Sequence, residues 1–195
     1  MGQLAVNLIL LINRIFPTTS VHRELASAKA SIPAYQSWEY DEIRRLYPEF
    51  GDDFNLRGKR VLDIGCGLGG KLQFYVEQGA SEVHGIDLRF KSLLAGSRMR
   101  DSDAHHQSLE RIKLTLADGA QLPFEDDSFD AVISVNVLEH VMEPGAVLRD
   151  CYRVLKPGAY LFLHFPPFYS PWGPHLDGWI NWPWPHLFFR ERDLV

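Results

Sequence analysis

A glycine-rich turn after a short apolar strand is the feature of this chain whose residue types and spacing point most directly to chemistry. Residues 59–70 read KRVLDIGCGLGG. Glycines at 65, 67 and 69 remove the Cβ atoms from one side of the turn, so a flat or extended ligand can touch the backbone. Through Gly65, Gly67 and Gly70 the same letters also satisfy the dinucleotide-binding pattern. The turn therefore indicates a nucleoside-containing cofactor and leaves open which one.

Acidic and polar side chains stand at the ends of the predicted strands. Asp63 lies late in the first strand, Asp87 ends the second, Asp118 with Gly119 follows the third, and Asn136 ends the fourth. In an open parallel sheet, ligands bind beyond the carboxyl ends of the strands, near the point where the strand order reverses. An acid at the end of the second strand can accept hydrogen bonds from ribose hydroxyls, which is expected for NAD and for S-adenosylmethionine alike.

The charge of Asp63 separates these two cofactors. A dinucleotide places its pyrophosphate at this turn, where the N-terminus of the following helix favours negative charge, and a carboxylate at position 63 would oppose that ligand. S-adenosylmethionine has no phosphate and carries a sulfonium and an ammonium group, which a nearby acid attracts. Asp118 can accept from the adenine amino group while the backbone N–H of Gly119 serves a ring nitrogen. The charges therefore favour S-adenosylmethionine.

Four stretches of the chain form a wider pattern, and they read VLDIGCGLGG (61–70), VHGIDL (83–88), ADGAQLPFEDDSFDAVISVNVLEHV (117–141) and LRDCYRVLKPGAYL (148–161). In this order and spacing the chain resembles the class I S-adenosylmethionine-dependent methyltransferases, and within them the small-molecule group often labelled type 11. The resemblance covers roughly positions 59 to 165. It implies an α/β fold with an open, mainly parallel, Rossmann-like sheet and helices on both faces. It also implies methyl transfer from S-adenosylmethionine to a small molecule.

The resemblance assigns the glycine-rich turn to the methionine part of the cofactor. Gly65, Gly67 and Gly69 would line this part, and Asp63 would lie near its ammonium group. Cys66 is counted with these cofactor-binding residues as a small loop filler, because nothing around it in the sequence indicates a nucleophile.

The resemblance assigns the adenosine part to the ends of the next two strands. Asp87 would hold the ribose hydroxyls, and Leu88 would pack on adenine. Asp118 and Gly119 would read the edge of the adenine ring.

The implied reaction is an in-line displacement at the sulfonium, for which the protein mostly aligns nucleophile, methyl group and leaving sulfur. Asn136 and Val137 would lie beside the sulfonium, where the acceptor approaches. A general base is needed only when the acceptor must lose a proton. We select His140 as the catalytic candidate, because the end of the fourth strand faces the transferred methyl group in the family; local pairing of His140 in a loop is the alternative. Other candidates for the proton transfer are Glu139, His164, His175 and His186.

Alternating strands and helices must position these residues. The pattern predicts strands at 60–64, 82–87, 112–116, 131–135 and 159–165, and helices at 69–78, 90–100 and 145–155. Strands separated by helical runs indicate a parallel sheet with crossover helices. Residues 20–50 read as helical with Pro33 dividing two segments, and Lys156-Pro157-Gly158 is a stop signal for the last helix.

We expect three regions in the chain. They are an N-terminal helical extension (1–50), an S-adenosylmethionine-binding Rossmann-like domain (51–165) and a Pro/Trp-rich tail (166–195) that serves as an acceptor lid or is a truncated remainder. The family fold continues after its fifth strand with another helix and two strands, which this chain lacks. We therefore read the chain as a fragment, or as a short variant that completes its sheet with a partner such as a second copy.

Composition narrows the choice of partners. The 195 residues carry a net charge of −5 and no long Lys/Arg run, which argues against a nucleic-acid binder. The two cysteines lack the spacing of a metal site or a disulfide framework and suit a reducing cytoplasm. Residues 4–16 (LAVNLILLINRIF) are too short to cross a bilayer and lack a secretory cleavage pattern. We read them as a packed helix, with peripheral membrane contact as the alternative.

Three functions compete at this stage. The leading one is methyl transfer to a small, apolar or lipid-like acceptor, for which the aromatic tail would supply contacts. The alternative is a non-catalytic cofactor-binding or scaffold protein with the methyltransferase fold. A nicotinamide oxidoreductase is disfavoured by Asp63 and by the pair Asp118 and Gly119.

Overall fold

The computed structural model describes residues 28–29, 31–51, 54–89 and 110–167. The chain divides into two compact units, one of Ala28–His164 and one of Met1–Ser27 with Phe165–Val195. The apolar segment 4–16, the helix expected at 90–100, and the tail from 168 with its two histidines lie outside the described residues. Within the described part, no helix is both long and apolar enough to span a membrane.

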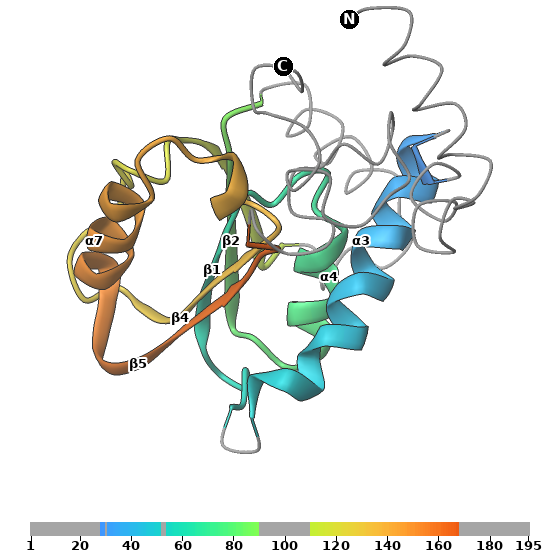
Figure 1. Cartoon of the computed structure of the whole chain (residues 1–195). Coiled ribbons are helices and arrows are strands. Elements are labelled where there is room, and N and C mark those ends of the chain that lie inside the picture. The colour runs from blue at the N-terminus through green and yellow to red at the C-terminus, as the bar shows by residue number, and fades with distance from the viewer. Residues whose placement is uncertain (1–27, 30, 52–53, 90–109, 168–195) are drawn as a thin grey trace, which may run out of the picture. The chain divides into compact units, whose positions relative to one another are not determined.

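A five-stranded sheet forms the centre of the unit Ala28–His164 (Figure 1). Its strands lie in the order β3-β2-β1-β4-β5, and all neighbouring pairs are parallel. The strand order reverses between β1 and β4, which places the switch point of the sheet at the carboxyl end of β1. The strand bounds are Arg60–Ile64 for β1, Glu82–Asp87 for β2, Ile112–Leu116 for β3, Phe129–Val135 for β4 and Leu155–His164 for β5.

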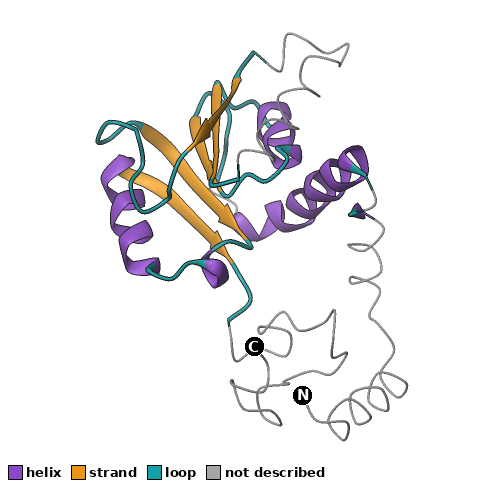
Figure 2. Ribbon diagram, turned by 90° about the horizontal axis from the view of Figure 1, so that it is seen from above, coloured by secondary structure: helices purple, strands orange, loops and turns teal. Residues whose placement is uncertain are grey.

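Helices cover both faces of the sheet, because successive side chains of a strand point to opposite sides (Figure 2). Val61 of β1 packs into a core that includes residues of α3 (Ile32–Leu46) and α4 (Gly70–Glu77). Its neighbour Leu62 packs into a second core with residues of α7 (Pro144–Val154). The α/β fold with a parallel sheet and helices on both faces is therefore confirmed.

The start of α3 follows ordinary capping chemistry. Ser31 is extended and its side chain accepts a hydrogen bond from Ala34 N at 3.3 Å, while Pro33 occupies the first turn, where its missing N–H costs nothing. Pro33 thus begins a helix, which is followed by the 3₁₀ turn Tyr47–Phe50. Although the sequence analysis assigns residues up to 50 to an extension, α3 lies within the same compact unit as the sheet.

The sequence places β1, β2 and β3 at their observed bounds, and its largest error concerns the last helix and strand. Helix α7 ends at Val154 and β5 begins at Leu155, so the predicted stop tripeptide Lys156-Pro157-Gly158 lies inside β5. The register between β4 and β5 shifts at this point, and Gly158 has a φ of +76°. A bulge in an edge strand accommodates both a proline and a left-handed glycine, so here the tripeptide bends a strand.

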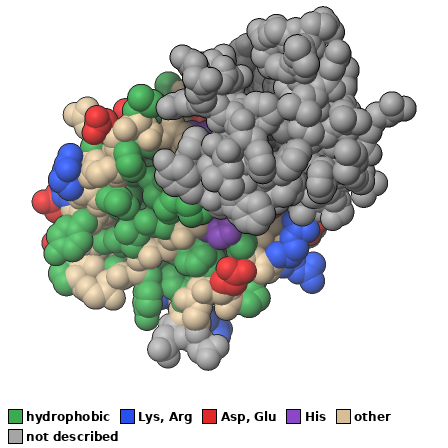
Figure 3. Space-filling model, in the orientation of Figure 1, with side chains coloured by type: hydrophobic (Ala, Val, Ile, Leu, Met, Phe, Trp, Pro, Cys, Tyr) green, Lys and Arg blue, Asp and Glu red, His purple; other side chains and the backbone are tan. Residues whose placement is uncertain are grey.

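Apolar side chains are exposed on the side of the unit that carries β5 and α7 (Figure 3). They include Tyr160 and Leu161 of β5, at 38% and 39% exposure, and Tyr152 of α7 at 83%. In the sheet as described, β5 pairs with β4 alone, so its outer edge runs beside these side chains. An unpaired edge with apolar neighbours is a surface on which further protein can pack.

Candidate cofactor-binding site

The glycine-rich loop after β1 owes its glycines to close neighbours as well as to its turn geometry. Gly65 and Gly67 have φ values of +71° and +58°, in the region that other residues rarely adopt. A Cβ at Gly65 would overlap a γ-methyl of Val137, and a Cβ at Gly67 would overlap Glu39 Oε1. The loop is therefore enclosed by the end of β4 on one side and by α3 on the other.

Part of the loop's hydrogen bonding goes to backbone acceptors. The N–H groups of Gly65 and Cys66 both donate to Ile86 O at 2.9 Å, and Gly69 N donates to Cys66 O at 3.0 Å. The Cys66 side chain is fully buried, and burial raises the pKa of its thiol well above the usual value. Cys66 therefore serves the loop through its backbone and its small size, as the sequence analysis expects.

The remaining loop N–H groups donate to two carboxylates. Gly67 N donates to Asp87 Oδ2 at 3.0 Å. Leu68 N donates to Glu39 Oε1 at 3.0 Å, and Gly70 N to Glu39 Oε2 at 2.9 Å. Every backbone N–H from position 65 to position 70 thus has an acceptor within the protein, and negatively charged oxygens take half of the loop.

Helix α3 holds the loop through Glu39 and Gln36, neither of which the sequence analysis identified. Gln36 Nε2 donates to Leu68 O at 2.7 Å. A Cβ at Gly70 would overlap Gln36 O, so only glycine allows α3 and α4 to approach this closely. Glu39 is 4% exposed, and burial raises its pKa to about 7 although Lys71 and the loop N–H groups favour its anion.

Beneath the loop, Asp63 belongs to a buried ion pair. Its carboxylate accepts a hydrogen bond from Tyr75 O–H at 2.7 Å and lies 3.6 Å from Lys71 Nζ. Burial raises the pKa of Asp63, against the influence of Lys71 and Tyr75. Burial also disfavours the charged form of Lys71, but Asp63, Glu39 and a further glutamate outweigh it, and the pKa of Lys71 is raised. Lys71 therefore balances much of the charge that the sequence analysis directs at the cofactor, and the contact of Asp63 with an ammonium group stays a prediction.

Asp87 stands at the end of β2, beside the loop. Its Oδ2 accepts from Gly67 N and its Oδ1 from Arg89 N at 2.7 Å, so both backbone contacts fix the carboxylate in place. A carboxylate has about four acceptor positions, so lone pairs remain for a ligand hydroxyl. The next residue, Leu88, is 69% exposed, which leaves its side chain available for packing on a ring.

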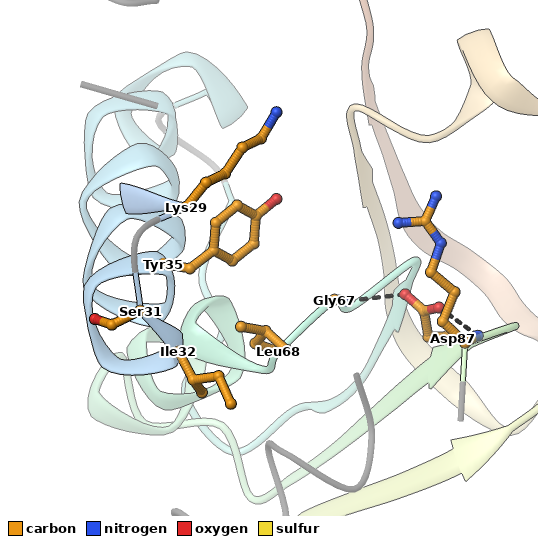
Figure 4. A pocket seen from close by; sticks show the side chains of 8 residues that line it. Lys29, Ser31, Ile32, Tyr35, Gly67, Leu68 and Asp87 are labelled. Carbon is orange, nitrogen blue, oxygen red and sulfur yellow. Dashed lines mark hydrogen bonds between the residues drawn. The ribbon is translucent and has the colours of Figure 1, made fainter. Parts of the chain in front are cut away.

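A cavity of about 270 Å³ lies between the beginning of α3 and the glycine loop (Figure 4). In this view Tyr35 projects from α3 toward the strand end that carries Asp87. The volume is close to the lower end of small-molecule sites, which begin at roughly 300 Å³. The sequence analysis predicted Gly67 and Asp87 at this place but none of the α3 side. The lining residues are Lys29, Ser31, Ile32, Tyr35, Gly67, Leu68, Asp87 and Arg89.

The other predicted cofactor residues lie at neighbouring strand ends. Asp118, after β3, is exposed and its Oδ1 accepts from Ala120 N at 2.9 Å, next to the half-buried Gly119. Asn136, after β4, has a φ of +57° and donates from Nδ2 to Glu42 Oε1 at 2.8 Å. The strand ends thus place the predicted residues at one edge of the sheet, although their contacts with a cofactor stay predictions.

His140 ends a short 3₁₀ turn, Leu138–His140, that follows β4. Its side chain is 62% exposed, and its Nε2 lies 3.9 Å from Glu139 Oε1. It lies outside the lining of the cavity beside Gly67 and Asp87. His164 ends β5, and its backbone oxygen accepts from Asn136 N at 2.8 Å. Among the residues that have described positions, no group of three or more His, Cys, Asp or Glu is placed to hold a metal ion.

Comparison with known proteins identifies the class of this site. A family model described as "Methyltransferase domain" matches residues 62–163. This chain belongs to that family, and its fold and glycine loop are those of a class I S-adenosylmethionine-dependent methyltransferase. The family thereby confirms S-adenosylmethionine as the cofactor that the sequence predicts, while the individual binding residues are not tested by it.

Similar proteins share this domain and extend beyond it. Over 125 residues the chain is 34% identical to "Phosphoethanolamine N-methyltransferase 2" of Caenorhabditis elegans, covering 64% of this chain and 27% of the relative. Over 150 residues it is 33% identical to "Ubiquinone biosynthesis O-methyltransferase" of Pseudomonas fluorescens (strain SBW25), covering 72% and 61%. A solved S-adenosylmethionine-dependent methyltransferase from Mesorhizobium loti matches at 28% identity with a TM-score of 0.52, covering 74% of this chain and 58% of that one. The chain thus spans less than two thirds of each of these proteins.

Proposed function

We propose that this protein binds S-adenosylmethionine at the carboxyl ends of β1 and β2 and transfers its methyl group to a small, apolar or lipid-like acceptor. The observation that carries the proposal is the loop beside Asp87, whose N–H groups all have internal acceptors. A loop of this kind offers no donors to a phosphate, and its carboxylates favour a cationic ligand. S-adenosylmethionine meets both conditions.

Each predicted residue has a task that its observed position supports. The lone pairs that remain on Asp87 suit ribose hydroxyls, and the exposed Leu88 suits the adenine face. Asp118 and Gly119 at the next strand end suit the edge of the ring. The cofactor supplies the activated methyl group, so the protein's part is to hold and orient it.

The sulfonium would lie at the end of β4. Val137 packs against Gly65, which brings this strand end into contact with the loop. The hydrogen bond from Asn136 to Glu42 fixes the backbone there in a left-handed conformation. We propose His140, exposed two turns of chain further on, as the base that accepts a proton from a hydroxyl acceptor.

The acceptor is proposed as a small molecule of nitrogen or oxygen chemistry. The names of the relatives include an N-methyltransferase for phosphoethanolamine and an O-methyltransferase of ubiquinone biosynthesis. The apolar character of the acceptor rests on the aromatic residues of the tail. A nucleic-acid acceptor is disfavoured by the net charge of −5.

Location and assembly complete the proposal. Cys66 and Cys151 are both free and buried, which suits a cytoplasmic protein. Peripheral membrane contact through residues 4–16 would bring the site close to a lipid-like acceptor. The edge of β5, with Tyr160 and Leu161 exposed beside it, supports assembly with a second copy.

A labelled-methyl transfer assay tests the proposal. The full chain is incubated with methyl-labelled S-adenosylmethionine and a cell lysate separated into soluble and lipid fractions, with Asp87→Asn as the inactive control. Label incorporated into a small molecule by the wild type alone supports the proposed function. Cofactor binding without product in any fraction would favour the alternative of a non-catalytic cofactor-binding protein.

A further inference from the structure

The beginning of α4 is a place where an anion is normally welcome. The N-terminus of a helix carries unsatisfied N–H groups and a positive partial charge, and a glycine-rich turn ahead of it is the usual cradle for a pyrophosphate. In this protein the carboxylate of Glu39 receives the N–H groups of Leu68 and Gly70 at this position. A side chain from α3 thus stands where a ligand phosphate would make its hydrogen bonds.

We propose that Glu39 is a specificity-determining residue that fills the phosphate position of the glycine loop and thereby excludes nucleoside phosphates and dinucleotides. The inference rests on the proposed function in one respect, that the cofactor admitted in their place is S-adenosylmethionine. Glu39 acts through the loop, so it is a positioning residue for the cofactor rather than a catalytic one.

The space around Glu39 supports this role. Its side chain is 4% exposed, and a Cβ at Gly67 would overlap its Oε1. The glycine at position 67 therefore makes room for a carboxylate of the protein. Gln36, one turn earlier in α3, donates to Leu68 O and anchors the same helix on the loop. A phosphate could reach the loop N–H groups only after Glu39 had left them.

The surrounding charges oppose a phosphate as well. Asp87 holds the neighbouring N–H of Gly67, and Asp63 lies beneath the loop. Lys71 is the buried cation of this region, and it is already engaged by Asp63 and by the carbonyl oxygen of Gly65 at 3.2 Å. A phosphate would therefore add negative charge to a site that holds three carboxylates and a single buried lysine. Such a loop accepts a ligand whose extended end carries an ammonium and a sulfonium.

The experiment compares two ligands on two variants by titration calorimetry. S-adenosylhomocysteine represents the phosphate-free cofactor, and ADP represents a nucleoside diphosphate. Glu39→Gln keeps the shape of the side chain but removes its charge and one of its two acceptor oxygens. Asp41→Asn, on the exposed side of the same helix, is the matched control. Thermal melts establish that each variant is folded at the temperature of the titration.

For the wild type we expect binding of S-adenosylhomocysteine at least 100-fold tighter than binding of ADP. In Glu39→Gln we expect this ratio to fall about tenfold, since a hydrogen bond to a charged group is worth roughly 1.5–3 kcal/mol and 1.4 kcal/mol is a factor of ten. Asp41→Asn should keep the wild-type ratio. A merely structural role for Glu39 would weaken both ligands together and leave the ratio unchanged, which would overturn the inference.

Two further outcomes separate this inference from the proposed function. If Glu39→Gln does not fold, Glu39→Asp is used, because it keeps the charge near Lys71 but withdraws the carboxylate from the loop, and the same fall in the ratio is expected. A wild type that binds and turns over S-adenosylmethionine but shows an unchanged ratio in the variants overturns the role of Glu39 alone. A wild type that binds no S-adenosylhomocysteine overturns both proposals.

Discussion

Lys71 Nζ lies 3.6 Å from Asp63 Oδ1, and the two side chains are 4% and 0% exposed. Lys71 also donates to Gly65 O at 3.2 Å and to Val135 O at 3.5 Å. One buried cation thereby joins β1, the glycine loop and the end of β4. The aspartate that looks in the sequence like a ligand for the cofactor is, in the fold, first a partner for this lysine.

Removal of Lys71 should destabilise the protein strongly. Lys71→Met leaves Asp63 as a buried charge without its cation, and breaking a buried ion pair in this way costs about 3–5 kcal/mol. Urea unfolding of the full chain measures the loss. The double variant Asp63→Asn with Lys71→Met removes both charges and should regain part of the stability. A single variant within about 1 kcal/mol of the wild type would show that the pair does not hold the fold.

Glu39 should make stability depend on pH. Its pKa is raised from 4.5 to about 7, chiefly by burial and also by Asp63, while Lys71 and the loop N–H groups lower it; Tyr35 is the other titratable group that senses its charge. Because the folded state then binds more protons than the unfolded state between about pH 4.5 and 7, the contribution of Glu39 to the free energy of unfolding falls as pH rises through this window. Urea unfolding of the wild type and of Glu39→Gln from pH 4 to 8 measures the difference. Parallel curves for the two proteins would contradict the prediction.

The contact between α3 and α4 at Gly70 predicts a large effect of one methyl group. Gly70→Ala places a Cβ on the backbone oxygen of Gln36, so the helices must separate, and we expect a loss of about 2 kcal/mol or more in the free energy of unfolding. Gly145→Ala is the matched control, because it lies in the first turn of α7 with nothing closer than Arg149 Nη1 at 3.7 Å.

The control should be neutral or stabilise by roughly 0.4–1 kcal/mol, as alanine does where the backbone suits it. Thermal and urea unfolding of both variants provide the comparison. Equal effects at the two glycines would show that α3 does not press on the loop as described.

His140 is tested by separating turnover from binding. His140→Asn removes the base but keeps a polar side chain at an exposed position, so the fold and the affinity for S-adenosylhomocysteine should be unchanged. With a hydroxyl acceptor, kcat should fall about 100-fold or more, since general-base catalysis contributes roughly 10²–10⁴. An unchanged kcat would assign His140 to the loop alone, which is the alternative that the sequence leaves open.

The sequence predicts the sheet and half of the site because both depend on local patterns. The glycine loop and Asp87 follow strands whose apolar runs are unambiguous, and parallel strands bring their ends together. Glu39 could not be predicted in this way. It lies in a helix that reads as polar and amphipathic, where a glutamate is normally solvated, and its hydrogen bonds reach a loop some 30 positions away in the chain.

Lys71 did leave a signal in the sequence. It stands four positions before Tyr75 on α4, in the same stripe as the apolar residues of that helix, and both side chains contact Asp63. A lysine on a buried helical face needs a buried anion, and the only acid within the preceding strand is Asp63. The bend of β5 at Lys156-Pro157-Gly158 left no comparable signal, because the same residues end helices and form bulges.

Titration calorimetry of the full chain with S-adenosylhomocysteine tests the central claim most directly. We predict saturable binding that Asp87→Asn weakens roughly 10- to 100-fold, because the amide cannot replace the carboxylate that holds Gly67 and Arg89, whereas the exposed Glu125→Gln leaves it unchanged. An absence of binding at high micromolar ligand, or tighter binding of NAD than of S-adenosylhomocysteine, would contradict the assignment of the glycine loop to S-adenosylmethionine.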